Sequence, residues 1–253
     1  MRDDNGYQTK ERTEAIKHHS GHMGIITTEL NVKILLSLLQ EMWYVSDYLI
    51  INGRHIELHT GGWSGNEEII EVLKASMFWC MYWRKSERGG HYYFELPDDG
   101  TKHLYLAGPI DGVTPEWATE WRRQAAGALK DRYYILDPTE GKDLYQDGVN
   151  DTLYTPEEIV EADLAMIKQA DVLLVDWRRL DNEQLMDIIN KYLNGGEYLD
   201  MPQGVGTHQE MVYSHLWGKK IYTFGDKRRG YWATYHSEHF DTLEQAIKYL
   251  RGE

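Results

Sequence analysis

Residues 171–176, with the sequence Asp-Val-Leu-Leu-Val-Asp, decide the fold of this chain. Four apolar residues in a row between two carboxylates are typical of a short strand that is buried on both faces. Strands of this kind belong to parallel sheets whose two faces are covered by helices. The segment therefore predicts an α/β architecture for its part of the chain.

The surrounding sequence alternates between strand and helix patterns over residues 101–253. Strands are predicted at residues 103–107, 133–136, 171–176 and 220–224, and helices at residues 115–129, 155–169, 182–193, 207–217 and 242–250. Thr114 and Thr207 are predicted N-caps, and Pro115 is predicted at a first helical position. This alternation predicts a parallel sheet with helices on both faces.

Residues 25–97 show a different pattern, which predicts a small α+β domain of unknown role. Helices are predicted at residues 30–43 and 64–78, and strands within residues 48–58, 79–83 and 91–95. The pair Asn52-Gly53 indicates a hairpin turn, and the turn-rich residues 97–100 indicate a domain boundary. Four of the nine tryptophans lie in this domain, either as a platform for a base or sugar or as core residues.

Composition limits the classes of function. The 253 residues are 42% hydrophobic and carry a net charge of −14, which argues against nucleic acid or an anionic membrane as partner. The single cysteine, Cys80, excludes internal disulfides and fits a reducing cytoplasm, and no apolar run is long enough for a membrane span. Residues 1–24 are polar and predict a poorly ordered tail. We expect a cytoplasmic protein with a small-molecule ligand.

The stretch at residues 201–211, Met-Pro-Gln-Gly-Val-Gly-Thr-His-Gln-Glu-Met, is the strongest candidate for a ligand loop. Its glycines let a backbone approach a ligand closely, and a helix that begins at Thr207 directs free N–H groups toward it. Glu210 then falls in the first turn, where the helix dipole also favours a carboxylate without any function. The loop is therefore open to a catalytic or a purely structural interpretation.

Topology brings this loop to the other candidate residues. In an open parallel sheet, ligands bind beyond the carboxyl ends of the strands. Those ends are predicted at Gly108-Pro109, at Asp137-Pro138 and at Asp176-Trp177, with the loop before Glu210 beside them. We expect these segments to converge on one edge of the sheet.

Three short segments carry a resemblance to a known family. They are Tyr-Leu-Ala-Gly-Pro at residues 105–109, Glu-Ala-Asp at 161–163 with the strand at 171–176, and Gly-Thr-His-Gln-Glu at 206–210. In this order and spacing they resemble the nucleoside 2-deoxyribosyltransferase family and its nucleotide N-glycosidase relatives, over about residues 102–253. The resemblance implies a flavodoxin-like fold and cleavage of an N-glycosidic bond, with transfer of the sugar to another base or to water.

The resemblance also assigns roles to individual residues. It implies that Glu210 is the nucleophile, that Asp163 is the acid for the leaving base, and that Tyr105 orients the nucleophile. Asp163 also belongs to an acidic helix start, and Tyr105 also fits a plain core position, so a structural interpretation of both stays open. The predicted substrate contacts are Gly108, Pro109, Asp176, Gln203, Gly206 and Thr207. No Walker, HExxH or paired CxxC motif is present, and we expect no metal and no cofactor.

Two departures from the family pattern leave the reaction open. Gly204 stands where transferases carry an aspartate that contacts the sugar, and Asp111 stands where a nucleotide site would favour a cation. The prediction is a homo-oligomeric nucleoside 2′-deoxyribosyltransferase. Its predicted substrates are a nucleoside and a free base, and it is expected to need no cofactor. The alternatives are an N-glycosidase that releases free base and a nucleotide-binding regulatory module without turnover.

Overall fold

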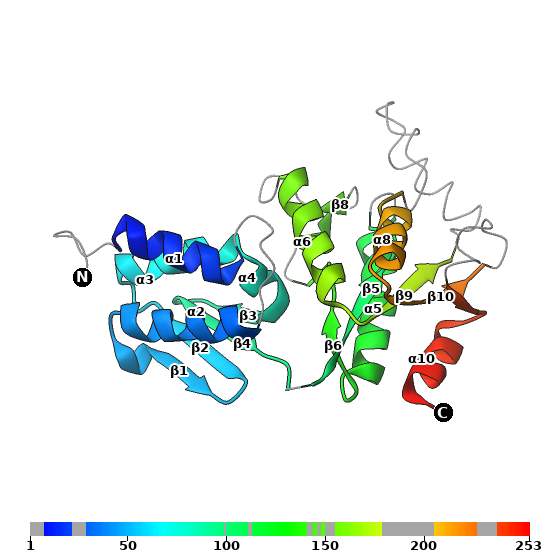
Figure 1. The fold of residues 1–253 in the computed structure, drawn as a ribbon, viewed down its shortest axis with the longest axis horizontal. Coiled ribbons are helices and arrows are strands. Elements are labelled where there is room, and N and C mark those ends of the chain that lie inside the picture. The colour runs from blue at the N-terminus through cyan, green and yellow to red at the C-terminus, as the bar shows by residue number, and fades with distance from the viewer. Residues whose placement is uncertain are drawn as a thin grey trace. The chain divides into compact units, whose positions relative to one another are not determined.

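The computed structural model describes residues 8–21, 29–98, 100–110, 113–140, 144–145, 148–149, 155–178, 205–226 and 237–253. The chain forms two compact units (Figure 1). One comprises residues 1–100 and 155–166, and the other comprises residues 101–154 and 167–253. Within the described residues, no helix is both long and apolar enough to cross a membrane.

The C-terminal unit contains a five-stranded parallel sheet. Its strands are β5 (Lys102–Ala107), β6 (Tyr133–Leu136), β9 (Val172–Trp177), β10 (Lys220–Gly225) and β11 (Glu238–Phe240), in the spatial order β11-β10-β9-β5-β6. Numbered along the unit, this order is 2-1-3-4-5, which is the flavodoxin-like doubly wound order. The predicted α/β class and parallel sheet are confirmed. The edge strand β11 was not predicted.

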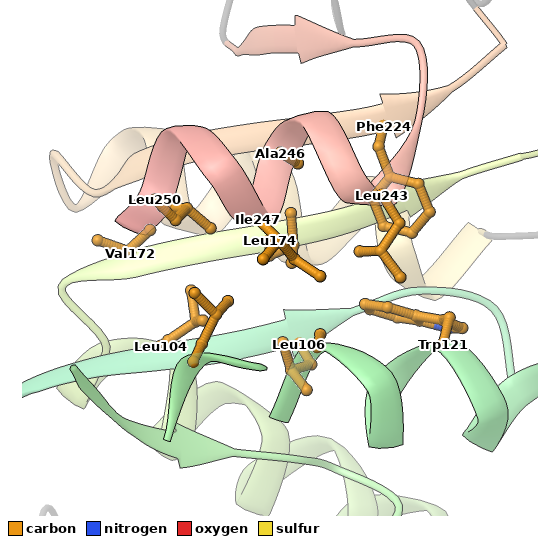
Figure 2. Packing of buried hydrophobic residues seen from close by; sticks show 12 residues of the cluster. Leu104, Leu106, Trp121, Val172, Leu174, Phe224, Leu243, Ala246, Ile247 and Leu250 are labelled. Carbon is orange, nitrogen blue, oxygen red and sulfur yellow. The ribbon is translucent and has the colours of Figure 1, made fainter. Parts of the chain in front are cut away.

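Alternating side chains divide this sheet into two faces. On one face, Leu104 and Leu106 of β5 pack with Val172 and Leu174 of β9. Helices α5 (Pro115–Leu129) and α10 (Leu243–Arg251) cover this face, as Figure 2 shows. Figure 1 shows α8 (Val205–Leu216) on the opposite side of β9 and β10 from α10. Burial of every residue of β9 explains why its sequence is apolar throughout its interior.

Two of the predicted helix caps can be compared with the structure. Thr114 caps α5, because its side chain accepts a hydrogen bond from the backbone of Trp117, and Pro115 opens the helix as predicted. The prediction for Thr207 is wrong, because α8 already begins at Val205. Thr207 lies inside the first turn, and its side chain is buried.

The N-terminal unit contains an antiparallel sheet of the order β1-β2-β4-β3. Its strands are β1 (Leu49–Asn52), β2 (His55–His59), β3 (Trp83–Glu87) and β4 (His91–Glu95). Its helices are α1 (Lys10–Ser20), α2 (Glu29–Met42), α3 (Ser64–Lys74) and α4 (Met77–Tyr82), with a short 3-10 turn at Ser46–Tyr48. The hairpin at Asn52-Gly53 is confirmed, with Gly53 at a φ of 59°.

Several local predictions differ from the structure. Residues 79–82 form part of helix α4 rather than a strand, and α3 ends at Lys74 rather than at residue 78. Helix α1 lies in the predicted polar tail and buries Ile16. The long loop after β6 contains a small hairpin, β7 (Leu144–Tyr145) and β8 (Gly148–Val149). The helix predicted at residues 182–193 lies outside the described residues.

Candidate active site

The structure brings Tyr105 and Glu210 together from segments that are far apart in the sequence. The phenol of Tyr105, on β5, donates a hydrogen bond to Oε1 of Glu210, on α8, over 2.7 Å. Tyr105 is fully buried, whereas Glu210 is half-buried. A carboxylate at the boundary of the core is thus held in one direction by a buried phenol.

The position of Tyr105 follows from the alternation along β5. Leu104 and Leu106 point into the cluster beneath α5 and α10, so Tyr105 points from the other face of the sheet. Helix α8 packs against strand β10. From this helix, the side chain of Glu210 extends to Tyr105 on β5. The same strand therefore contributes to the apolar core and to the candidate site.

The position of Glu210 follows from helical spacing along α8. Thr207, Met211 and Ser214 are buried, and their spacing of three and four residues marks the face of the helix that packs against the unit. Glu210 lies three residues after Thr207 and four before Ser214, on this same face. Ser214 Oγ donates to the backbone oxygen of Glu210 over 2.6 Å, which adds a local hydrogen bond at this turn.

A carboxylate held in this way is suited to attack an electron-poor carbon. The phenol O–H stabilises the ionised form of Glu210 through a charge-assisted hydrogen bond and fixes its direction. Carboxylates serve as nucleophiles toward the anomeric carbon in glycoside cleavage. The geometry fits a nucleophile and its positioning residue.

Gly108 follows β5 at the carboxyl end of the sheet and has a packing reason to be glycine. A Cβ atom there would lie 2.9 Å from Cζ2 of Trp121 and 3.0 Å from Cβ of Asp176. Its carbonyl accepts a hydrogen bond of 2.7 Å from Nη2 of Arg122. The close approach of helix α5 and strand β9 accounts for this glycine without a ligand, and its contact with substrate stays a prediction.

Arg122 is a buried charge that the sequence did not indicate. Its side chain is fully buried on α5, and its guanidinium donates to the backbone oxygens of Leu106, Gly108 and Ala118. Asp137, which follows β6, lies 3.7 Å from Nε. Arg122 therefore anchors the chain segment that leaves β5 at the predicted ligand edge. Its positive charge also lies close to the negative charge of Asp137.

Asp176 lies at the end of β9 and is held by Arg178. Nε and Nη2 of Arg178 donate to its two carboxylate oxygens over 2.9 and 2.8 Å, and the backbone N–H of Arg178 donates over 3.0 Å. Arg178 also lies over the ring of Trp117, on α5, at 4.6 Å from its centroid. Two residues after Leu174 in the strand, Asp176 points to the α5 and α10 face, opposite Tyr105. The structure does not bring Asp176 to Glu210.

Trp177 is the last residue of β9 and points toward α8. Its ring centroid lies 4.7 Å from that of His208, two residues before Glu210 on α8. Trp177 is buried and His208 is exposed. The sequence placed Trp177 at the sheet edge and did not single it out as a site residue.

The remaining predicted residues differ in burial. Gly206 is exposed in the first turn of α8, whereas Pro109, which follows Gly108, is buried. Gln203 lies outside the described residues. Asp163 is half-buried on α6 (Pro156–Gln169), in the stretch that groups with the N-terminal unit, and its role as acid stays a prediction. No group of three or more His, Cys, Asp or Glu side chains in the described part of the chain is placed to hold a metal ion.

Comparisons with known proteins add three structures of low similarity. The 2-deoxyribosyltransferase of Bacillus psychrosaccharolyticus is 19% identical, over 58% of this chain and 91% of that one, with a TM-score of 0.40. The Clostridium botulinum CMP N-glycosidase BcmB is 14% identical, over 60% and 100%, with a TM-score of 0.38. The 2-desoxiribosyltransferase of Leishmania mexicana is 20% identical, over 56% and 76%, with a TM-score of 0.34. No family model and no curated protein matches the chain. Similarities this low carry no conclusion about chemistry.

Proposed function

We propose that the chain is a nucleoside 2′-deoxyribosyltransferase, which cleaves the N-glycosidic bond of a 2′-deoxynucleoside and transfers the sugar to another base. The observation that carries this proposal is the 2.7 Å hydrogen bond from Tyr105 to Glu210. It joins the two residues that the sequence motifs select as positioning residue and nucleophile, although they lie 105 residues apart in the chain. If Tyr105 and Glu210 had only structural roles, a hydrogen bond between the phenol of one and the carboxylate of the other would not be expected.

The proposed reaction has two half-reactions. In the first, the carboxylate of Glu210 forms a bond to C1′ of the sugar as the bond to the base breaks, and Asp163 gives a proton to the leaving base. In the second, a ring nitrogen of the incoming base attacks C1′, the ester to Glu210 breaks, and the proton returns to Asp163. The transition states have oxocarbenium character, which a nearby carboxylate stabilises.

Tyr105 contributes differently to the two half-reactions. Its hydrogen bond directs the carboxylate toward C1′ in the first step, which reduces the entropy cost of reaching the reactive geometry. In the second step Glu210 regains its negative charge as it leaves C1′. A phenol that donates to the carboxylate stabilises this charge as it develops, so Tyr105 lowers the barrier of ester breakdown.

The experiment that tests the proposal is a chromatographic assay of base exchange. The full chain is incubated with a panel of 2′-deoxynucleosides and their 5′-monophosphates, with and without an added free base. We expect a new nucleoside that appears only when the second base is present. Release of free base without exchange would assign the N-glycosidase reaction instead, and no product from any donor would overturn both enzymatic readings.

Glu210→Gln tests the role of the nucleophile directly. It keeps the size of the side chain and its hydrogen bond to Tyr105 but removes the negative charge. We expect the rate of exchange to fall by about four orders of magnitude, as for other essential nucleophiles. Glu120→Gln is the matched control, because Glu120 is an exposed residue on α5 in the same unit. Retention of activity in Glu210→Gln would contradict the proposal.

A further inference from the structure

Two histidines face each other on the antiparallel sheet of the N-terminal unit. His59, the last residue of β2, is paired in register with His91, the first residue of β4. The backbone N–H of Thr60 donates to the oxygen of Gly90 at the next position, so His59 and His91 form a non-hydrogen-bonded pair. Side chains approach each other most closely at pairs of this kind.

The two imidazole rings contact each other through their Nδ1 atoms. Nδ1 of His91 lies 2.8 Å from Nδ1 of His59, and the ring planes are inclined by 67°. A single proton between two neutral rings satisfies this contact, with one Nδ1 as donor and the other as acceptor. The two Nδ1 atoms therefore face each other at a distance that a shared ligand atom or ion could also bridge.

Glu57 decides which ring accepts. Its Oε2 lies 3.3 Å from Nε2 of His59, on the far side of the ring from His91. A carboxylate in this position favours the tautomer with its proton on Nε2, and so leaves the lone pair of His59 on Nδ1. The Glu57–His59 contact matches the carboxylate–histidine arrangement that orients metal-binding imidazoles.

The surrounding charge also favours a cation. Glu87 of β3 is paired in register with His91, and Glu57 lies two residues before His59 on the same face of β2. Lys85 neutralises Glu87 through a 2.6 Å ion pair, which leaves Glu57 as the carboxylate directed at the histidine pair. Two ring nitrogens thus face each other, and the carboxylate of Glu57 lies on the outer side of His59.

We propose that His59 and His91 form a binding site for a divalent transition metal, Cu(II) or Ni(II), with Glu57 as a positioning residue. Metal–imidazole bonds of about 2.0 Å place two cis ligands of a square-planar ion about 2.8 Å apart, and those of a tetrahedral ion about 3.3 Å apart. The observed separation of 2.8 Å, which is also that of an N–H···N hydrogen bond, is compatible with the square-planar case. The ion takes the place of the proton on His91 Nδ1, and His91 takes up a proton on Nε2.

Such a site has two protein ligands, and water completes the coordination. Cu(II) leads the affinity order of first-row divalent ions at nitrogen sites, so it is the probe of choice. The site lies in the N-terminal unit and is independent of the reaction proposed at Glu210.

The test is electron paramagnetic resonance of the full chain titrated with Cu(II) in a non-chelating buffer. We expect one tightly bound ion per chain, with hyperfine coupling from two equatorial imidazole nitrogens. His59→Gln and His91→Gln should each abolish the two-imidazole spectrum. Glu57→Gln should keep this spectrum and weaken the binding by about tenfold, because the carboxylate that orients the ring of His59 is lost.

His55→Gln is the matched control, because His55 lies on the same strand β2 and pairs with Glu95 rather than with a histidine. It removes one histidine and should leave the spectrum and the affinity unchanged. Circular dichroism of each variant without metal confirms that the variants are folded. A two-imidazole spectrum that persists in His59→Gln, or one that His55→Gln removes equally, would overturn the proposal. So would an affinity for Cu(II) that no variant changes.

Discussion

The two faces of the parallel sheet are built from the same strands but differ in chemistry. Beneath α5 and α10, Leu104, Leu106 and Leu174 pack into an apolar cluster (Figure 2). On the face toward α8, β5 presents Tyr105, whose phenol holds the carboxylate of Glu210. One face supplies burial that stabilises the unit, and the other supplies a positioned charge. Because side chains alternate, a single strand can supply both without compromise.

This difference makes a clear expectation for mutations of adjacent residues in β5. A change at Leu106 should act on stability, and a change at Tyr105 should act on catalysis. The two residues are neighbours in the chain and are both fully buried, so burial alone does not separate them.

Leu106→Ala should lower the free energy of unfolding by about 2–5 kcal/mol, because it removes a buried side chain and leaves a cavity in the apolar cluster. Urea unfolding followed by circular dichroism measures this change. Leu216→Ala is the control, since Leu216 of α8 is 69% exposed, and its effect should be small. Equal losses of stability in the two variants would break the distinction between the two faces.

Tyr105→Phe should lower kcat by about ten- to a hundredfold, which corresponds to the loss of one charge-assisted hydrogen bond in the transition state. KM should change little, because Tyr105 is a positioning residue that acts on Glu210. Tyr133→Phe on the neighbouring strand β6 removes a hydroxyl that donates to the backbone of Leu250 instead. If Tyr133→Phe reduced kcat as much as Tyr105→Phe, the hydrogen bond to Glu210 would have no special role.

His103, near the start of β5, should have a smaller and pH-dependent effect on the free energy of unfolding. Burial lowers the pKa of His103 below its usual value, against a weaker opposing effect of Asp171, and Lys219 adds to the lowering. The folded state therefore prefers neutral His103. The associated stability is present above the unfolded pKa of about 6.5 and is lost as the pH falls through the lowered folded pKa.

The check is urea unfolding between neutral and mildly acidic pH, with wild type and His103→Gln compared. We expect the loss of stability toward acid to be shallower in the variant, because its side chain does not titrate. A parallel loss in both proteins would show that other groups set the pH dependence.

Much of the fold was predictable from local sequence. The strands of residues 103–107, 133–136 and 220–224 lie within a residue of β5, β6 and β10, because their apolar runs are short and bounded by turn residues. Thr114 and Pro115 predict the start of α5, because threonine is a common N-cap and proline is favoured at the first helical position. Residues 79–82 of helix α4 are predicted as a strand, because the sequence Met-Phe-Trp-Cys-Met-Tyr of this helix is apolar throughout and has no helical period. Strand β11 is too short and polar to show a pattern.

The candidate site was less accessible from sequence. Tyr105 and Glu210 were selected by resemblance to family motifs, because neither strand alternation nor helix capping predicts that they meet. Arg122 was missed, because an arginine on an amphipathic helix normally lies in solvent, and only the tertiary structure brings it to the oxygens of Leu106 and Gly108. The ion pair between Asp176 and Arg178 was also missed, because it forms only where strand β9 ends.

In the proposed reaction Glu210 becomes covalently attached to the sugar, and a trapping experiment can detect this intermediate. A 2′-deoxynucleoside analogue with fluorine at the arabino position of C2′ slows both half-reactions and allows the glycosyl ester to accumulate. Mass spectrometry of the intact chain and of its peptides should then show one added sugar, located on Glu210. An adduct on another residue, or turnover of ordinary substrate without any adduct under these conditions, would contradict the account.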